Sequence, residues 1–135
     1  MNLLKALILT AKIFFRSKVP LFSLIVNCLL AYVLLLWNGY YEVELLIILL
    51  NILTSLSLIY SEKFSLESAL TGLRICGAKV NIMRSFISIY SLFLATFLTS
   101  VQIIQLRLLG LVEFVSVLIV SAIALSYINK KLIYS

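Results

Sequence analysis

The chain has 135 residues, of which 64% are hydrophobic and 12% are charged, and its formal net charge is +6. A soluble domain of this size is about half apolar and about a quarter charged. The composition therefore excludes a water-soluble globular protein and predicts one membrane domain over residues 1–135. The positive charge does not indicate a nucleic-acid partner, because membrane proteins concentrate Lys and Arg in their cytoplasmic flanks.

Catalytic and metal-binding motifs are missing from the sequence. There is no histidine, and the two cysteines, Cys28 and Cys76, have no CxxC neighbour. His-ligated haem, His-rich zinc sites and Ser-His-Asp catalysis are thereby excluded. There is also no G-x-x-x-x-G-K-[ST] phosphate loop. We expect no catalytic residue, cofactor or metal, and therefore a protein that is not itself an enzyme.

Residues 1–18 combine a basic stripe with an apolar face. On a helix, Lys5, Lys12 and Arg16 fall within about 40° of one another. The other side carries Leu4, Leu7, Ile8, Ala11, Phe14 and Phe15. This pattern predicts an amphipathic helix in the membrane interface. A signal peptide is the alternative, but its apolar region would be interrupted by basic residues.

Four apolar segments follow, each close to the roughly 20 residues that a helix needs to cross a bilayer. They are residues 19–37, 43–60, 86–106 and 111–128. We expect an all-α integral membrane protein in which these four segments are transmembrane helices.

Several of these spans contain amides or hydroxyls, namely Asn27, Asn51, Ser55, Gln102 and Gln105. Such groups in lipid hydrogen-bond across helix interfaces, so we expect them to hold neighbouring helices together. Asn51 and Ser55 are four residues apart and share one helix face. For Gln102 and Gln105, the alternative is a polar lining at the outer end of a cavity.

Basic residues are distributed asymmetrically between the two sides of the predicted spans. One side receives Lys5, Lys12, Arg16, Lys18, Lys63, Arg74, Lys79, Arg84, Lys130 and Lys131, and the other receives only Arg107. Because Lys and Arg remain in cytoplasmic loops, both termini are predicted to be cytoplasmic. The expected location is the plasma membrane, which the chain would cross several times.

Arg107 and Glu113 lie on either side of the short turn between the last two spans. We expect an outer-side charged pair, or a Glu113 carboxylate that reaches the lipid headgroups. A proton-relay role for Glu113 is the alternative, because ionisable residues in spans are often functional.

Residues 61–85 form the long polar interruption of the chain. They predict a short cytoplasmic helix between the second and third spans. Gly77 is expected to end this helix in a left-handed or sharply bent conformation, since glycine adopts positive φ without steric cost.

The sequence LRICGAKVNI, residues 73–82, resembles the LRALGASRRQI motif of the FtsX-like permeases, the MacB-type (type VII) ABC transporter membrane subunits. In that family the motif lies in the coupling segment between the second and third spans. The chain differs from the family in having Ala69 where an acidic residue is usual. It also has only a short connection where the family has an extracytoplasmic domain, so it resembles a reduced form.

The resemblance implies that the coupling segment docks on a separate ABC-type ATPase, which would bind ATP, and that the chain forms a homodimer or a heterodimer with a related permease. The implied ATPase contacts are Glu67, Leu70, Leu73, Arg74, Gly77, Ala78 and Lys79. Two alternatives remain: a structural or accessory subunit of a larger membrane complex, and a small four-span exporter or channel acting alone.

Overall fold

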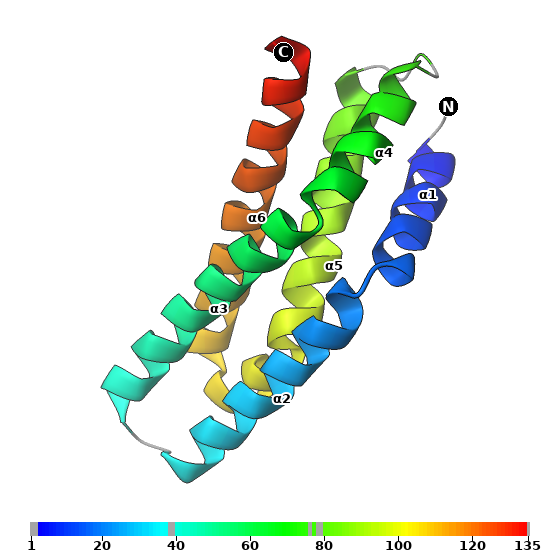
Figure 1. Ribbon diagram of the computed structural model, residues 1–135. Helices are drawn as coiled ribbons and strands as arrows, with labels where there is room; N and C mark the ends of the chain where they lie inside the picture. The colour runs from blue at the N-terminus through cyan, green and yellow to red at the C-terminus, as the bar shows by residue number, and fades with distance from the viewer. Residues whose placement is uncertain (1–2, 38–39, 76, 78–79, 135) are drawn as a thin grey trace.

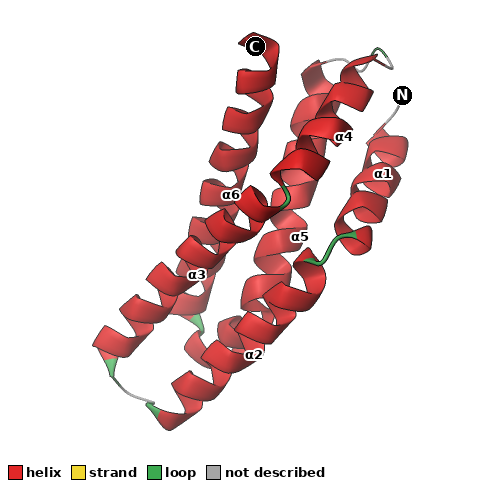
Figure 2. Ribbon diagram, in the orientation of Figure 1, coloured by secondary structure: helices red, strands yellow, loops and turns green. Residues whose placement is uncertain are grey.

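The computed structural model describes residues 3–37, 40–75, 77 and 80–134, and these residues form six α-helices and no strand (Figures 1 and 2). The helices are α1 Leu3–Arg16, α2 Val19–Leu36, α3 Tyr41–Ser61, α4 Lys63–Ile75, α5 Val80–Leu106 and α6 Leu108–Tyr134. Four of them, α2, α3, α5 and α6, are long and apolar enough to cross a membrane. The prediction of an all-α protein with four candidate membrane spans is therefore confirmed.

The helices that contain the last two predicted spans continue beyond the span limits. α5 begins at Val80, before the span predicted from residue 86, and α6 continues to Tyr134, beyond the span predicted to end at residue 128. Hydropathy locates the part of a helix that fits lipid, whereas a helix ends only where its backbone hydrogen bonding stops. No glycine or proline interrupts either extension. Much of the predicted polar segment 61–85 is consequently helical.

α5 is the central helix of the bundle, because it contacts α1, α2, α3 and α6. Leu94, Ala95 and Leu98 on α5 are fully buried. The α5–α6 hairpin is tight at Gly110, where a Cβ would lie 2.6 Å from Ile103 Cα. Only glycine permits this approach of the two backbones.

The exposed faces of the long helices change character along their length. Near its start, α5 exposes Asn81, Arg84 and Ser88, whereas further along it exposes Val101 and Ile104. The exposed surface of α5 is therefore more polar at its start than at its end. Figure 1 shows α1, α4 and the C-terminal end of α6 beside this first part of α5. We call this region, formed by α1, α4, the start of α5 and the end of α6, the polar end of the bundle.

Two helix breaks occur side by side at the base of the polar end. Residues from the α1–α2 joint (Arg16, Ser17 and Lys18) and from the α3–α4 joint (Glu62 and Ser65) line one pocket of about 480 Å³. α5 and α6 pass this level without a break. The polar end is thus joined to the spans by two continuous helices and two joints.

α1 packs along α5 more closely than its sequence predicts. Ala6, Thr10 and Phe14 form a buried stripe, and the Phe14 ring contacts the Tyr90 and Phe93 rings at centroid distances of 5.4 and 5.5 Å. Phe14, predicted on the lipid-facing side, is therefore a core residue. The apolar side chains that α1 leaves exposed are Leu4, Leu7, Ile8 and Phe15.

Candidate functional site

α4 is an amphipathic helix whose buried face is purely aliphatic. Leu66, Leu70 and Leu73 recur at helical spacing and are almost completely buried, against a bundle in which α4 contacts α3 and α6. Lys63 and Glu67 form an i,i+4 ion pair at 3.9 Å on the same helix. Burial of the three leucines fixes α4 on the bundle.

The end of α4 is set by glycine and by a bond to another helix. Gly77 has a φ of 78°, as the sequence predicts, and its N–H donates to the carbonyl oxygen of Arg74 at 3.0 Å. The guanidinium of Arg74 donates to the side-chain oxygen of Asn129 at 2.9 Å and to its carbonyl oxygen at 3.2 Å. Arg74 therefore ties the last turn of α4 to α6.

The opposite face of α4 is uncovered. Phe64, Ser68, Thr71 and Ile75 are spaced by four, three and four residues, which places them on one helix face, and all four are exposed. Phe64 is 83% and Ile75 81% exposed. We call these four residues the α4 stripe. The stripe thus carries one open apolar side chain near each end of α4 and two hydroxyls between them.

The structure corrects the predicted set of ATPase contacts. Leu70 and Leu73 are buried inside the chain and cannot touch a partner, because the apolar face of α4 packs on its own bundle. Arg74 and Glu67 are half-buried and bond within the chain. Gly77 is exposed. The remaining two predicted contacts, Ala78 and Lys79, lie outside the described residues.

A chain of amides joins three spans inside the bundle. Asn51 on α3 donates to the side-chain oxygen of Gln102 on α5 at 2.6 Å. Gln102 in turn donates to the side-chain oxygen of Asn27 on α2 at 3.2 Å. Asn27 completes the chain by donating to the Ser100 hydroxyl at 2.8 Å and to the Phe97 carbonyl at 3.2 Å. The three amides are fully buried.

The other two predicted packing residues behave differently from each other. Gln105 donates to the Ala31 carbonyl on α2 at 3.3 Å, so it also crosses between spans. The Ser55 hydroxyl, by contrast, bonds the Ile52 carbonyl of its own helix at 2.7 Å. Ser55 is nevertheless fully buried, as is Asn51, so the helix face that they share packs against protein as expected. Its hydroxyl bonds within α3 because a short hydroxyl in a helix easily reaches the carbonyl of the preceding turn.

Arg107 and Glu113 are not paired. Arg107 sits in the turn with a φ of 56° and is exposed, whereas Glu113 is 0% exposed. Neither carboxylate oxygen of Glu113 has a hydrogen-bond partner among the described residues. The predicted outer-side pair is corrected, because the α5–α6 packing encloses Glu113 and leaves Arg107 outside.

Glu113 lies at the depth of the amide chain. Gly110 abuts Ile103, and the two helices run in opposite directions, so three residues further along α6 corresponds to about Ser100 on α5. Ser100 is the residue that accepts from Asn27. An enclosed carboxylate at this level is a candidate functional group by its position alone, since ionisable residues in spans are costly.

Sequence reasoning did not single out Phe64 or Ile75 as contact residues or Asn129 as a bonding partner. Asn129 is 55 residues from Arg74 in the sequence, and only the tertiary packing brings them together. The stripe, in contrast, has a signal: Phe64 and Ile75 lie on the helix face opposite Leu66, Leu70 and Leu73.

No protein-family model matches the sequence, and no curated protein or solved structure matches it significantly.

Proposed function

We propose that this chain is a permease-like membrane subunit, of the FtsX-like kind, that works with a separate ABC-type ATPase and itself carries no catalytic site. In this proposal the α4 stripe docks on the ATPase, and ATP-driven movement of that partner is passed through α4 to the spans. Both termini and α4 would face the cytoplasm of a cell whose plasma membrane holds the four spans, as the Lys and Arg distribution suggests.

The observation that carries the proposal is that α4 has one exposed face and an opposite face that is attached to the bundle. Phe64 and Ile75 are open to a partner, while Leu66, Leu70 and Leu73 are buried in the chain. A surface that binds a motor must be linked rigidly to what it moves. The Arg74–Asn129 bond supplies such a link to α6, and α6 packs on the central helix α5.

The mechanism follows from these attachments. A push on the stripe displaces α4, and the buried leucines and Arg74 transmit the displacement to the end of α6. α5 and α6 are continuous from the polar end to the far side of the spans, so their movement reaches the level of the amide chain and Glu113. A dimer, with itself or with a related permease, would let two such units move against each other.

The proposal is tested by purification of the tagged full chain from the membranes of its own cells. We expect recovery of a protein with a G-x-x-x-x-G-K-[ST] loop, and ATPase activity that rises when the purified chain is added. The double variant Phe64→Ala with Ile75→Ala should lower the recovered ATPase at least about tenfold, because each side chain would lose about 1.5–3 kcal/mol of burial.

Leu4→Ala is the matched control, since Leu4 is an exposed apolar residue on α1 and is not part of the stripe. It should leave ATPase recovery unchanged. Absence of an ATPase from the wild-type preparation, or full recovery with the double variant, would reject the proposed function.

A structural or accessory subunit is the second candidate, and the amide chain favours it. Asn27, Asn51 and Gln102 hydrogen-bond to one another and to the backbone. Their polar groups are therefore used for helix packing rather than for lining a transport pathway. This candidate predicts stable recovery with partners that lack a phosphate loop, and no dependence on the α4 stripe. The same purification therefore separates the two functions.

A further inference from the structure

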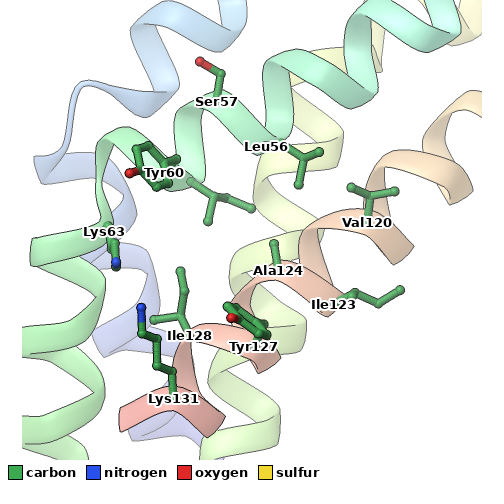
Figure 3. A pocket seen from close by; sticks show the side chains of 11 residues that line it. Leu56, Ser57, Tyr60, Lys63, Val120, Ile123, Ala124, Tyr127, Ile128 and Lys131 are labelled. Carbon is green, nitrogen blue, oxygen red and sulfur yellow. The ribbon is translucent and has the colours of Figure 1, made fainter. Parts of the chain in front are cut away.

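An apolar groove runs between α3 and α6 on the outside of the bundle (Figure 3). Its volume is about 690 Å³, within the roughly 300–1,000 Å³ range of small-molecule sites. Leu56 lines it from α3, and Val120 and Ile123 line it from α6. Ile123 is 64% exposed, so the groove is open to the surroundings of the spans rather than enclosed.

One end of the groove is basic. Lys63 from α4 and Lys131 from α6 line this end, and Figure 3 shows their amino groups extending toward each other. Lys63 is partly compensated by Glu67 at 3.9 Å. Lys131 is exposed and has no ion pair with any residue that the structure describes. Two ammonium groups that converge in this way repel each other unless an anion lies between them.

Tyrosine side chains mark the transition between the apolar and basic parts. Tyr60 and Tyr127 line the groove next to the lysines, and both are largely exposed. The Lys63 ammonium lies 5.9 Å from the centre of the Tyr60 ring. Tyrosine with lysine is the composition of the membrane–water boundary, where the ring meets apolar chains and the hydroxyl meets headgroups.

The geometry points to a binding site for an acidic phospholipid in this groove. An acyl chain would lie along Leu56, Val120 and Ile123, and the phosphate group would lie between Lys63 and Lys131. The lipid belongs to the leaflet at the polar end of the bundle. The proposal does not depend on the ATPase proposal, because it uses neither the α4 stripe nor a partner protein.

Shape and charge together favour a lipid over a second protein chain. From Val120 to Lys131 the groove follows about 16 Å of helix, comparable with a headgroup layer plus the adjoining part of the hydrocarbon. The ligand must therefore be apolar for most of this length and anionic at one end. A second copy of this chain, with net charge +6, offers few acidic side chains to meet the lysines.

The test is native mass spectrometry of the full chain, purified in mild detergent and incubated with equal amounts of phosphatidylglycerol and phosphatidylcholine with identical acyl chains. The wild type should retain phosphatidylglycerol in preference to phosphatidylcholine. Lys131→Gln should lower the retained phosphatidylglycerol about five-fold, as expected for one lysine at a membrane surface, and leave phosphatidylcholine unchanged.

Lys130→Gln is the matched control, because Lys130 is the adjacent exposed lysine and does not line the groove. It should leave the lipid preference unchanged. Ala124→Phe, at a residue that lines the groove, should lower the retention of both lipids by filling the space for the acyl chain. Circular dichroism should show wild-type helix content in every variant, and Lys131→Gln gives the test if Ala124→Phe fails to fold.

Three results would overturn the proposal. The first is a wild-type chain with no preference for phosphatidylglycerol. The second is an equal effect of Lys130→Gln and Lys131→Gln, which indicates attraction by surface charge alone. The third is an Ala124→Phe chain that keeps its lipid but changes from dimer to monomer, which makes the groove an interface between two chains.

Discussion

Asn51 and Gln102 form the shortest side-chain bond between two spans, with 2.6 Å between the Asn51 amide nitrogen and the Gln102 oxygen. Because Gln102 also donates to Asn27, this one bond closes a connection among α2, α3 and α5. Specific side-chain hydrogen bonds therefore hold the bundle together, in addition to its apolar contacts.

The hydrogen bond predicts a measurable coupling free energy between Asn51 and Gln102. Asn51→Leu and Gln102→Leu should each lower the free energy of unfolding in mixed micelles. In a double-mutant cycle the coupling should be about 0.6–1.7 kcal/mol, the range for such bonds in membranes. Thr54→Ala is the control, because the Thr54 hydroxyl bonds its own helix. Strict additivity of the Asn51 and Gln102 effects would contradict the bond.

The Arg74–Asn129 hydrogen bond adds to the buried leucines in attaching α4 to the bundle. Asn129→Leu should raise the rate of amide hydrogen exchange in the last turn of α4 and lower its stability by about 1 kcal/mol, the net value of a typical hydrogen bond, because the bond to Arg74 is only partly buried. Arg84→Gln, which changes an exposed basic residue on α5, should leave α4 exchange unchanged. Equal exchange in the two variants would show that the leucines alone hold α4.

Two glycines should respond in opposite directions to the same substitution. Gly110→Ala should lower the free energy of unfolding by about 1–3 kcal/mol, because its Cβ would meet the Ile103 backbone at 2.6 Å. Gly72→Ala, in a helix with nothing within 4 Å of the new Cβ, should raise it by about 0.5–1 kcal/mol. Unfolding in mixed micelles measures both, and a stabilised Gly110→Ala chain would disprove the tight hairpin.

Removal of the Glu113 carboxylate should stabilise the protein. Its two oxygens lack partners among the described residues, and an unmet buried polar group costs about 1–3 kcal/mol. Glu113→Met should therefore raise the free energy of unfolding by about that amount, whereas Glu42→Gln at an exposed site should have little effect. A loss of stability in Glu113→Met would mean that the carboxylate has a partner in the assembled protein.

The all-α fold and the number of candidate spans could be predicted from the sequence because they depend on runs of about 20 apolar residues. The hydrogen-bond partner of each polar side chain could not be predicted. Gln102 and Gln105 look equivalent in the sequence, yet one joins side chains and the other reaches the Ala31 backbone. Which bond forms depends on the rotation and spacing of neighbouring helices, and hydropathy contains neither.

Amphipathic faces were the other source of error. The sequence identifies an apolar face on α4 and on α1, but it does not say whether lipid, a partner or the chain itself covers that face. On α4 the bundle covers it, burying Leu70 and Leu73. On α1 the bundle buries Phe14 but leaves Leu4 and Phe15 of the predicted apolar face exposed. The residues left for other contacts are those on the remaining faces, including Phe64 and Ile75.

The adjacent joints near Ser17 and Glu62 make the molecule compliant on one side and stiff on the other. Where α1 meets α2 and α3 meets α4, no continuous ladder of helical hydrogen bonds resists bending, while α5 and α6 keep theirs. If a partner pulls on α4, as in the proposed function, the polar end would therefore tilt about this edge rather than translate uniformly. The elastic cost of such a tilt would be borne by the curvature of α5 and α6.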